Sequence, residues 1–227
     1  MKKLFLGLTP FVAVGALNLW AFANEDRFPN PMATHWGITG QPDGFASLVT
    51  HMTWTNFGLG LVALIWLIVT FIKTPVAIKR IFLLIVGYLF AVLFLLMTYL
   101  LVIQLDVTDP TAIRFGGWML LFLAPVLGLL PLMLSMPKVT ISEQLKISLL
   151  GFPLLTLDLA QVNGAAISKV RASDFGGWGL RYANKTTAFV PSSGSALQLD
   201  LQDGTKVLIR NDDPQELVDL IMGRKAN

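Results

Sequence analysis

The sequence predicts an all-α membrane domain of four helices, followed by a small all-β domain that ends in one helix. The distribution of charge and a change in hydrophobic pattern predict this fold class. Residues 1–137 contain seven Lys/Arg and five Asp/Glu, whereas residues 138–227 contain ten and nine. The charged fraction of 14% is well below the ~25% of a soluble domain. We therefore expect a transmembrane domain over 1–137 and a folded soluble domain over 138–227.

Four apolar stretches are long enough to span a bilayer, since a transmembrane helix needs about 20 mostly apolar residues. None has a charged residue in its interior. They are Leu4–Ala23, Met52–Ile72, Ile81–Leu105 and Gly116–Met136. The first stretch has a second interpretation as a cleavable signal peptide, because Lys2 and Lys3 precede it and Ala21-Phe22-Ala23 resembles a cleavage site. The other three spans keep their topology under either interpretation.

The distribution of basic residues predicts the orientation of the spans, because Lys and Arg accumulate in cytoplasmic loops. The N-terminus and the connection between the second and third spans are basic, whereas the other two connections carry one basic residue each. The residues on the basic side are Lys2, Lys3, Lys73, Lys79 and Arg80. We expect both termini in the cytoplasm, a location in the cytoplasmic (inner) membrane, and an extracytoplasmic loop over 24–51.

The composition also excludes several kinds of function. The chain has no cysteine, so disulfides, thiol catalysis and cysteine metal sites are excluded. The net charge of +3 arises from dispersed residues, whereas nucleic-acid binding needs basic residues clustered on one face. We expect no nucleic-acid partner and no cofactor.

The loop 24–51 has the composition of a rigid segment. Its prolines restrict the backbone, and Pro42-Asp43-Gly44 has the composition of a tight turn. Such a loop would hold His35 and Trp36 on a fixed scaffold at the membrane interface.

The order of these residues resembles a signature of a bacterial membrane domain of unknown function found in the Sdp toxin-immunity family. The matching residues are Pro31, His35, Trp36, Gly40, Pro42, Asp43 and Gly44. The resemblance implies a small multi-span membrane protein that, in some members, is linked to immunity against a secreted toxic peptide and to signalling. It makes Pro31, His35, Trp36, Gly40, Pro42 and Asp43 the candidate binding residues.

Other interpretations of the polar residues remain open. In one alternative, the loop residues have no ligand and only pack the loop against the helix ends. His35, Asp43 and His51 can be considered as three zinc ligands, although their spacing matches no compact motif. Within or near the spans, Asn18, Asn56 and Gln104 are predicted to hydrogen-bond between helices, and Gly58, Gly60, Gly87 and Gly128 are predicted to allow close helix packing.

Short strands follow Pro137, separated by turn residues, as in a small barrel or sandwich. The predicted strands are Val139–Ile141, Leu145–Leu150, Leu154–Leu157, Ala166–Val170, Leu180–Ala183, Ala188–Val190, Leu197–Leu201 and Lys206–Arg210. For the last two, a three-residue loop ending in a left-handed Gly204 pairs Leu199 with Val207 and Leu197 with Ile209. A final helix is predicted, with Asp213 as N-cap, Pro214 at its first position and Glu216 completing a capping box. Its predicted apolar face consists of Leu217, Val218, Leu220 and Ile221.

Strands followed by one helix resemble a pleckstrin-homology-like (PH-like) domain, a barrel closed by a C-terminal helix. The segment Phe175–Tyr182 resembles one seen in bacterial membrane proteins with such tails. This resemblance implies a cytoplasmic interaction domain without catalysis, with a protein or anionic lipids as its partner. Four basic residues, Lys169, Arg171, Arg181 and Lys185, can face lipid headgroups or form an ordinary solvated surface.

The leading hypothesis is a non-enzymatic membrane protein of the sensing, binding or toxin-immunity type. It would bind a peptide or protein at loop 24–51 and use its tail for cytoplasmic interactions. A transporter or channel component is the alternative, although the spans lack the buried charges that transporters usually carry. An enzyme is less expected, because nucleophile and base candidates are few.

Overall fold

The computed structural model describes residues 2–114, 127–129, 131, 135–175 and 179–225. These residues form two compact units, one of Met1–Ile72 with Leu83–Leu127 and one of Lys73–Phe82 with Gly128–Asn227.

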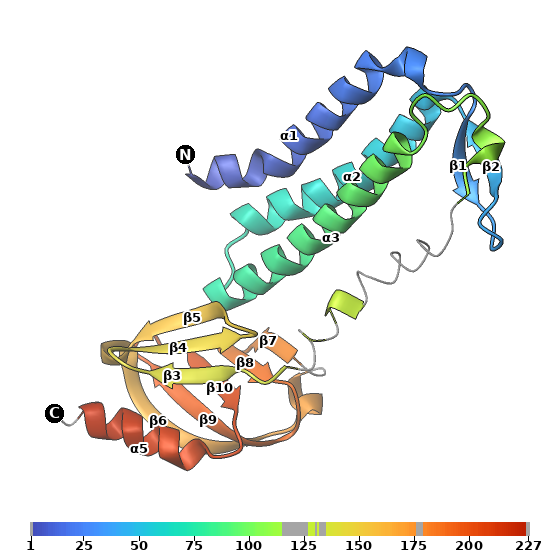
Figure 1. Cartoon of the computed structure of the whole chain (residues 1–227). Coiled ribbons are helices and arrows are strands. Elements are labelled where there is room, and N and C mark those ends of the chain that lie inside the picture. Colours follow the sequence, from blue (N-terminus) through green and yellow to red (C-terminus); the bar gives the residue numbers. More distant parts are fainter. Residues whose placement is uncertain (1, 115–126, 130, 132–134, 176–178, 226–227) are drawn as a thin grey trace. The chain divides into compact units, whose positions relative to one another are not determined.

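Three long helices dominate the helical part of the chain (Figure 1): α1 (Lys2–Ala23), α2 (Leu48–Phe71) and α3 (Val76–Val102). All three are long and apolar enough to cross a membrane, which confirms three predicted spans as candidates. Helix α3 begins five residues before the predicted Ile81, because hydropathy marks only the apolar part of a helix. Its first turns belong to the second unit, where Ala77 is buried in the core. Most of the predicted fourth span, Gly116–Met136, lies outside the described residues.

Polar side chains connect α1 with α2. The amides of Asn18 and Asn56 exchange two hydrogen bonds, each of 2.8 Å between nitrogen and oxygen. The prediction that these amides bond between helices is therefore confirmed. Gly87 allows close packing, since a Cβ there would lie 2.8 Å from the Trp66 ring. Gly58 and Gly60 do not have this role, because a Cβ at either would meet no described atom within 4 Å.

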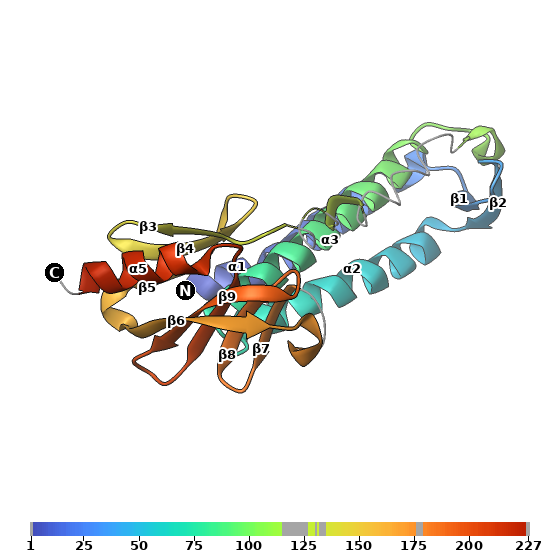
Figure 2. The same cartoon turned by 90° about the horizontal axis from the view of Figure 1, so that it is seen from below.

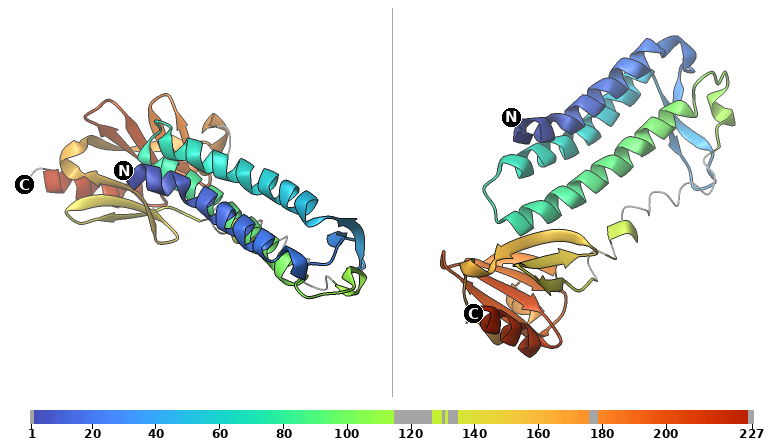
Figure 3. Two further views of the ribbon diagram at one scale, coloured as in Figure 1. Left: turned by 90° about the horizontal axis from the view of Figure 1, so that it is seen from above. Right: turned by 60° about the vertical axis from the view of Figure 1, so that its left-hand side comes forward.

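A β-hairpin lies where α1 ends and α2 begins (Figure 3). Its antiparallel strands are β1 (Met32–Trp36) and β2 (Pro42–Ala46). Short 3-10 turns flank this end of the unit at Glu25–Arg27 and Pro110–Ala112. The predicted loop 24–51 is thus an ordered element with its own backbone pairing.

The second unit contains two antiparallel-rich sheets and a C-terminal helix (Figure 2). The three-stranded sheet has the order β3-β4-β5, and the five-stranded sheet has the order β6-β9-β10-β8-β7. The strands are β3 (Lys138–Ile141), β4 (Gln144–Leu149), β5 (Phe152–Asp158), β6 (Val162–Val170), β7 (Gly179–Ala183), β8 (Thr186–Val190), β9 (Gly194–Leu201) and β10 (Lys206–Arg210). All eight predicted strands are present, and the described strands of this unit form two sheets; a closed PH-like barrel is not confirmed.

The hairpin of β9 and β10 has the predicted register. Val207 pairs with Leu199 and Ile209 with Leu197, and Gly204 has a φ of 75° at the end of the three-residue loop. All four paired side chains are buried in the core between the sheets. Burial of one apolar face therefore determined the register, as expected.

Helix α5 (Pro214–Lys225) ends the chain and contacts β6 and β9. The Asp213 carboxylate accepts a hydrogen bond from the Glu216 backbone N–H at 3.5 Å, which confirms the predicted N-cap. The reciprocal half of the capping box is absent, because the Asp213 N–H donates to Asn211 Oδ1 at 2.8 Å instead. Ile221 is fully buried, whereas Leu220, predicted on the apolar face, is exposed.

Candidate functional site

The predicted turn of the loop is displaced from Pro42-Asp43-Gly44, whose residues belong to strand β2. The chain turns at Gly37–Gln41, where the Gly37 N–H donates to the Gln41 carbonyl at 2.9 Å. Gly40 has a φ of 75°, a conformation that favours glycine. Gly44 is needed for a different reason, since it lies opposite His35 and a Cβ there would come within 2.8 Å of the His35 Cβ.

Two candidate binding residues face each other across the hairpin. The His35 Nδ1 and the Asp43 Oδ1 are in hydrogen-bond contact, and this contact becomes an ion pair when the imidazole is protonated. Both side chains are more than half exposed. The hairpin therefore presents a positioned imidazole and carboxylate to the surroundings.

The remaining candidate residues contact other parts of the chain or lie at the ends of the hairpin. The Trp36 indole N–H donates to the Ile113 carbonyl at 3.1 Å, and Trp36 pairs with Pro42 across the strands. Pro31 follows a cis peptide bond immediately before β1, and Gly40 is in the turn. The structure thus brings His35 together with Asp43, and Trp36 together with Pro42. Pro31 lies at the other end of the hairpin.

Gln104 and Arg27 attach this region to the helix ends. The fully buried Gln104 amide accepts from the Ala33 N–H at 2.8 Å and donates to the Ala33 carbonyl at 3.0 Å. Gln104 was predicted to bond between helices, and its partner is instead the backbone of β1. Arg27 makes two hydrogen bonds with the Asp106 carboxylate, at 3.0 and 2.6 Å. This contact lowers the pKa of Asp106, mainly because the guanidinium hydrogen-bonds the ionised carboxylate.

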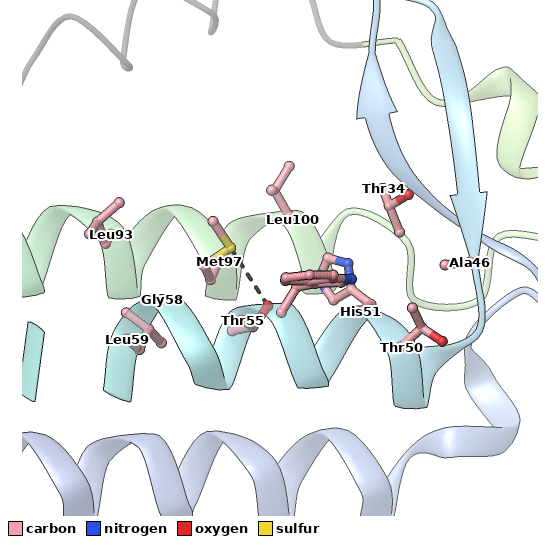
Figure 4. Close-up of a pocket in the computed structure, with 11 residues that line it drawn as sticks. Thr34, Ala46, Thr50, His51, Thr55, Gly58, Leu59, Leu93, Met97 and Leu100 are labelled. Atoms are coloured by element: carbon pink, nitrogen blue, oxygen red, sulfur yellow. Dashed lines mark hydrogen bonds between the residues drawn. The ribbon is translucent and has the colours of Figure 1, made fainter. Parts of the chain in front are cut away.

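A cavity of about 350 Å³ lies beside the hairpin, between α2 and α3 (Figure 4). Strands β1 and β2 contribute Thr34 and Ala46 to its wall. Its remaining lining residues are Thr50, His51, Trp54, Thr55, Gly58 and Leu59 from α2, and Leu93, Met97 and Leu100 from α3. Thr34, Thr50 and His51 lie towards the hairpin end, Thr55 lies midway, and Leu59 and Leu93 lie at the other end. The cavity therefore has polar groups towards its hairpin end and only apolar residues at the other.

His51 and Thr55 are the buried polar residues among those described in the wall of this cavity. His51 is only 6% exposed. Its Nε2 has no hydrogen-bond partner among the residues that the structure describes. The nearby Thr55 hydroxyl is already engaged, since it donates to the Met97 sulfur at 3.7 Å. A buried polar atom without a partner costs free energy, so a ligand that hydrogen-bonds to His51 would remove this cost.

Apart from His51, which was considered as a zinc ligand, the cavity residues were not among the residues predicted to bind a ligand. The α2 positions 51, 54, 55, 58 and 59 have the spacing of one helix face, and this spacing was a usable signal. The contribution of α3 had no such signal, because it depends on how two helices pack. Ser47 is the N-cap of α2 and accepts from the Thr50 N–H at 3.3 Å.

The zinc site considered for His35, Asp43 and His51 is not formed. His35 contacts Asp43, whereas His51 is buried in the wall of the cavity. Within the described ranges, no group of three or more His, Asp or Glu side chains is arranged to hold a metal ion.

A family model matches the hairpin and part of each flanking helix. Residues 12–61 match a domain of unknown function (DUF1648). This match covers most of α1, the whole hairpin and the part of α2 that lines the cavity. No curated protein and no solved structure matches the chain. Together with the three apolar helices, the match indicates a membrane domain of unknown function.

Proposed function

We propose that this chain is a non-enzymatic protein of the cytoplasmic membrane that binds a peptide or protein through the hairpin of β1 and β2. The observation that carries this proposal is an exposed hairpin held in one conformation by buried contacts. Gln104 holds its first strand, and Trp36 bonds to Ile113. Binding residues commonly lie on loops that a rigid scaffold positions.

The exposed surface of the hairpin suits a peptide partner. Ile38 is 96% exposed at the turn, and Phe45 is also exposed, so apolar contacts are available beside the His35–Asp43 pair. Because the hairpin is already ordered, binding would require little loss of conformational freedom. This combination supports a role in sensing or in immunity, as the resemblance of this loop to the Sdp toxin-immunity family also suggests.

The proposed orientation places the hairpin outside the cell and both termini in the cytoplasm. The basic residues Lys73, Lys79 and Arg80 near the start of α3 support it, since Lys and Arg accumulate on the cytoplasmic side. The two-sheet unit would then act as a cytoplasmic interaction domain of the PH-like kind, with a protein or anionic lipids as its partner. Binding at the hairpin would be coupled to this domain through the spans.

A toxin-challenge experiment tests the proposal. Cells that lack this protein are exposed to the peptides secreted by the source species, and survival is compared after complementation with the wild-type chain or with a variant. We expect the deletion to sensitise the cells, the wild-type chain to restore survival, and Ile38→Asp to fail. Leu150→Asp, which places the same charge on an exposed turn residue of the other unit, is the control and should restore survival. Equal survival with and without the protein would contradict the immunity role.

A further inference from the structure

The His51 cavity has no role in the proposed function, which concerns the exposed surface of the hairpin. Its chemistry nevertheless points to a ligand. A buried imidazole nitrogen without a described partner lies in a cavity of about 350 Å³, which is within the range of small-molecule sites, although near its lower end. Such a volume accommodates one small molecule or one chain of a larger one.

The polar and apolar groups of the cavity are separated along the helix axis. His51 lies near the start of α2, and Leu59 is eight residues further, which corresponds to about 12 Å at 1.5 Å per residue. Thr34 and Thr50 share the His51 end with Ala46 and Leu100, Thr55 lies midway beside Met97, and Leu93 shares the Leu59 end (Figure 4). A ligand that fits this gradient has a polar head and an apolar chain.

We propose that this cavity binds a single-chain amphiphile, with a hydroxyl or ester carbonyl at His51 Nε2 and its hydrocarbon chain along Leu59, Leu93 and Met97. A hydroxyl can pair with either neutral tautomer, because it both donates and accepts. A carbonyl pairs with the tautomer that carries its proton on Nε2.

The location of the cavity favours a lipid as the source of this ligand. Its helical walls belong to two helices that are long and apolar enough to cross a membrane. Trp54, which lines the cavity, is 70% exposed and makes an edge-to-face contact with the exposed Phe57. Exposed aromatic rings near a helix end are typical of the interface where lipid headgroups meet acyl chains. A monoacylglycerol has hydroxyls, an ester carbonyl and one chain, so it carries all the required groups.

Photolabelling of the full-length protein in detergent micelles tests this proposal, with 1-oleoylglycerol that carries a diazirine in its acyl chain as the probe. We expect saturable labelling of α2 or α3 between the levels of His51 and Leu59, and competition by unlabelled 1-oleoylglycerol. Labelling that rises in proportion to the probe concentration without saturation would overturn the proposal, because it would show contact with bulk lipid only.

Two glycines in α2 offer a matched pair of variants. Gly58 lines the cavity, whereas Gly60 does not, and a Cβ at either position meets no described atom within 4 Å. Gly58→Leu should fill the cavity and reduce saturable labelling at least tenfold, while Gly60→Leu should leave it unchanged. Equal labelling of the two variants would contradict a site in this cavity.

His51→Phe tests the polar end, because it keeps a ring in place and removes the hydrogen-bonding nitrogen. A single hydrogen bond corresponds to a change of about twofold to tenfold in affinity, so the concentration of unlabelled 1-oleoylglycerol that halves labelling should rise by that factor. Circular dichroism checks that the variant keeps its helix content. An unchanged competition curve would show that His51 does not bind the headgroup.

A cross-linking experiment identifies any other occupant. A photoreactive benzoylphenylalanine at position 58, which should react with whatever fills the cavity, is illuminated in native membranes. Cross-links to lipid support the proposal. Cross-links to another part of the same chain would overturn it.

Discussion

The side-chain amide of Gln104 pairs with the backbone of Ala33 as a neighbouring strand would. It accepts from the Ala33 N–H at 2.8 Å and donates to the Ala33 carbonyl at 3.0 Å, and it also donates to the Leu100 carbonyl at 2.8 Å. Gln104 is fully buried. One side chain just beyond the end of α3 therefore satisfies both backbone groups of a residue in β1 and connects the hairpin to the helices.

Replacement of Gln104 by Leu should destabilise the helical unit. The variant leaves the N–H and carbonyl of Ala33 without a partner, and each buried unsatisfied group costs about 1–3 kcal/mol. We expect the free energy of unfolding to fall by about 2–4 kcal/mol, as measured by denaturant titration in detergent micelles. Gln41→Leu, at an exposed glutamine of the same hairpin, should change it by less than about 0.5 kcal/mol. Equal effects of the two variants would contradict the role given to Gln104.

Asn18 and Asn56 should show energetic coupling. Either single substitution by Leu leaves one amide without its interhelical partner, whereas the double substitution removes both polar groups. Interhelical hydrogen bonds in membrane proteins contribute about 0.6 kcal/mol on average and up to about 1.7. We expect a coupling free energy of about 0.5–1.5 kcal/mol in a double-mutant cycle of unfolding. Strictly additive effects would show that the two amides do not interact.

Gly44→Ala should disturb the hairpin, because the new Cβ would lie 2.8 Å from the His35 Cβ. The strands would have to move apart, at a cost of about 1–3 kcal/mol. Limited proteolysis should then cleave the segment 37–41 faster than in the wild-type protein. Gly15→Ala is the control, since a Cβ at that position in α1 meets no described atom within 4 Å. Unchanged cleavage of Gly44→Ala would mean that the strands are not this close.

The Arg27–Asp106 contact should make part of the stability acid-sensitive. The folded-state pKa of Asp106 is lowered by Arg27, below an ordinary value near 3.9. The contribution of this contact is therefore present above that ordinary value and is lost as the pH falls through the lowered pKa.

Carboxyl NMR titration of labelled aspartate checks this prediction. Arg27→Gln should raise the pKa of Asp106 towards its ordinary value. Asp109 is an internal control, because hydrogen bonds from Thr111 lower its pKa and the substitution should not change it. An Asp106 titration that is identical with and without Arg27 would contradict the assigned cause.

Local and periodic features could be predicted from the sequence. Alternating leucines in β9, followed by Asp203-Gly204, specify both the register with β10 and the bulged loop, because only that register buries one apolar face. Asp213 before Pro214 similarly marks the start of α5. These predictions depend on residues close in the chain, so the sequence contains the necessary information.

Features that depend on contacts between distant residues could not be predicted. Pro42-Asp43-Gly44 has the composition of a turn, yet these three residues lie in strand β2, where Gly44 packs closely against His35. Gln104 meets Ala33 across 71 positions, and no local pattern indicates this partner. The cavity at His51 likewise requires Leu93, Met97 and Leu100 from another helix. Each of these features arises from packing rather than from propensity.

Accessibility of single cysteines from outside the cell tests the central claim most directly, and the natural chain has no cysteine to interfere. Ile38→Cys places a thiol at the exposed turn of the hairpin, and Leu150→Cys places one at an exposed turn of the two-sheet unit. In intact spheroplasts, a membrane-impermeant maleimide should label Ile38→Cys at once and Leu150→Cys only after permeabilisation. Labelling of Leu150→Cys alone before permeabilisation would contradict the proposal that the hairpin is an external binding element.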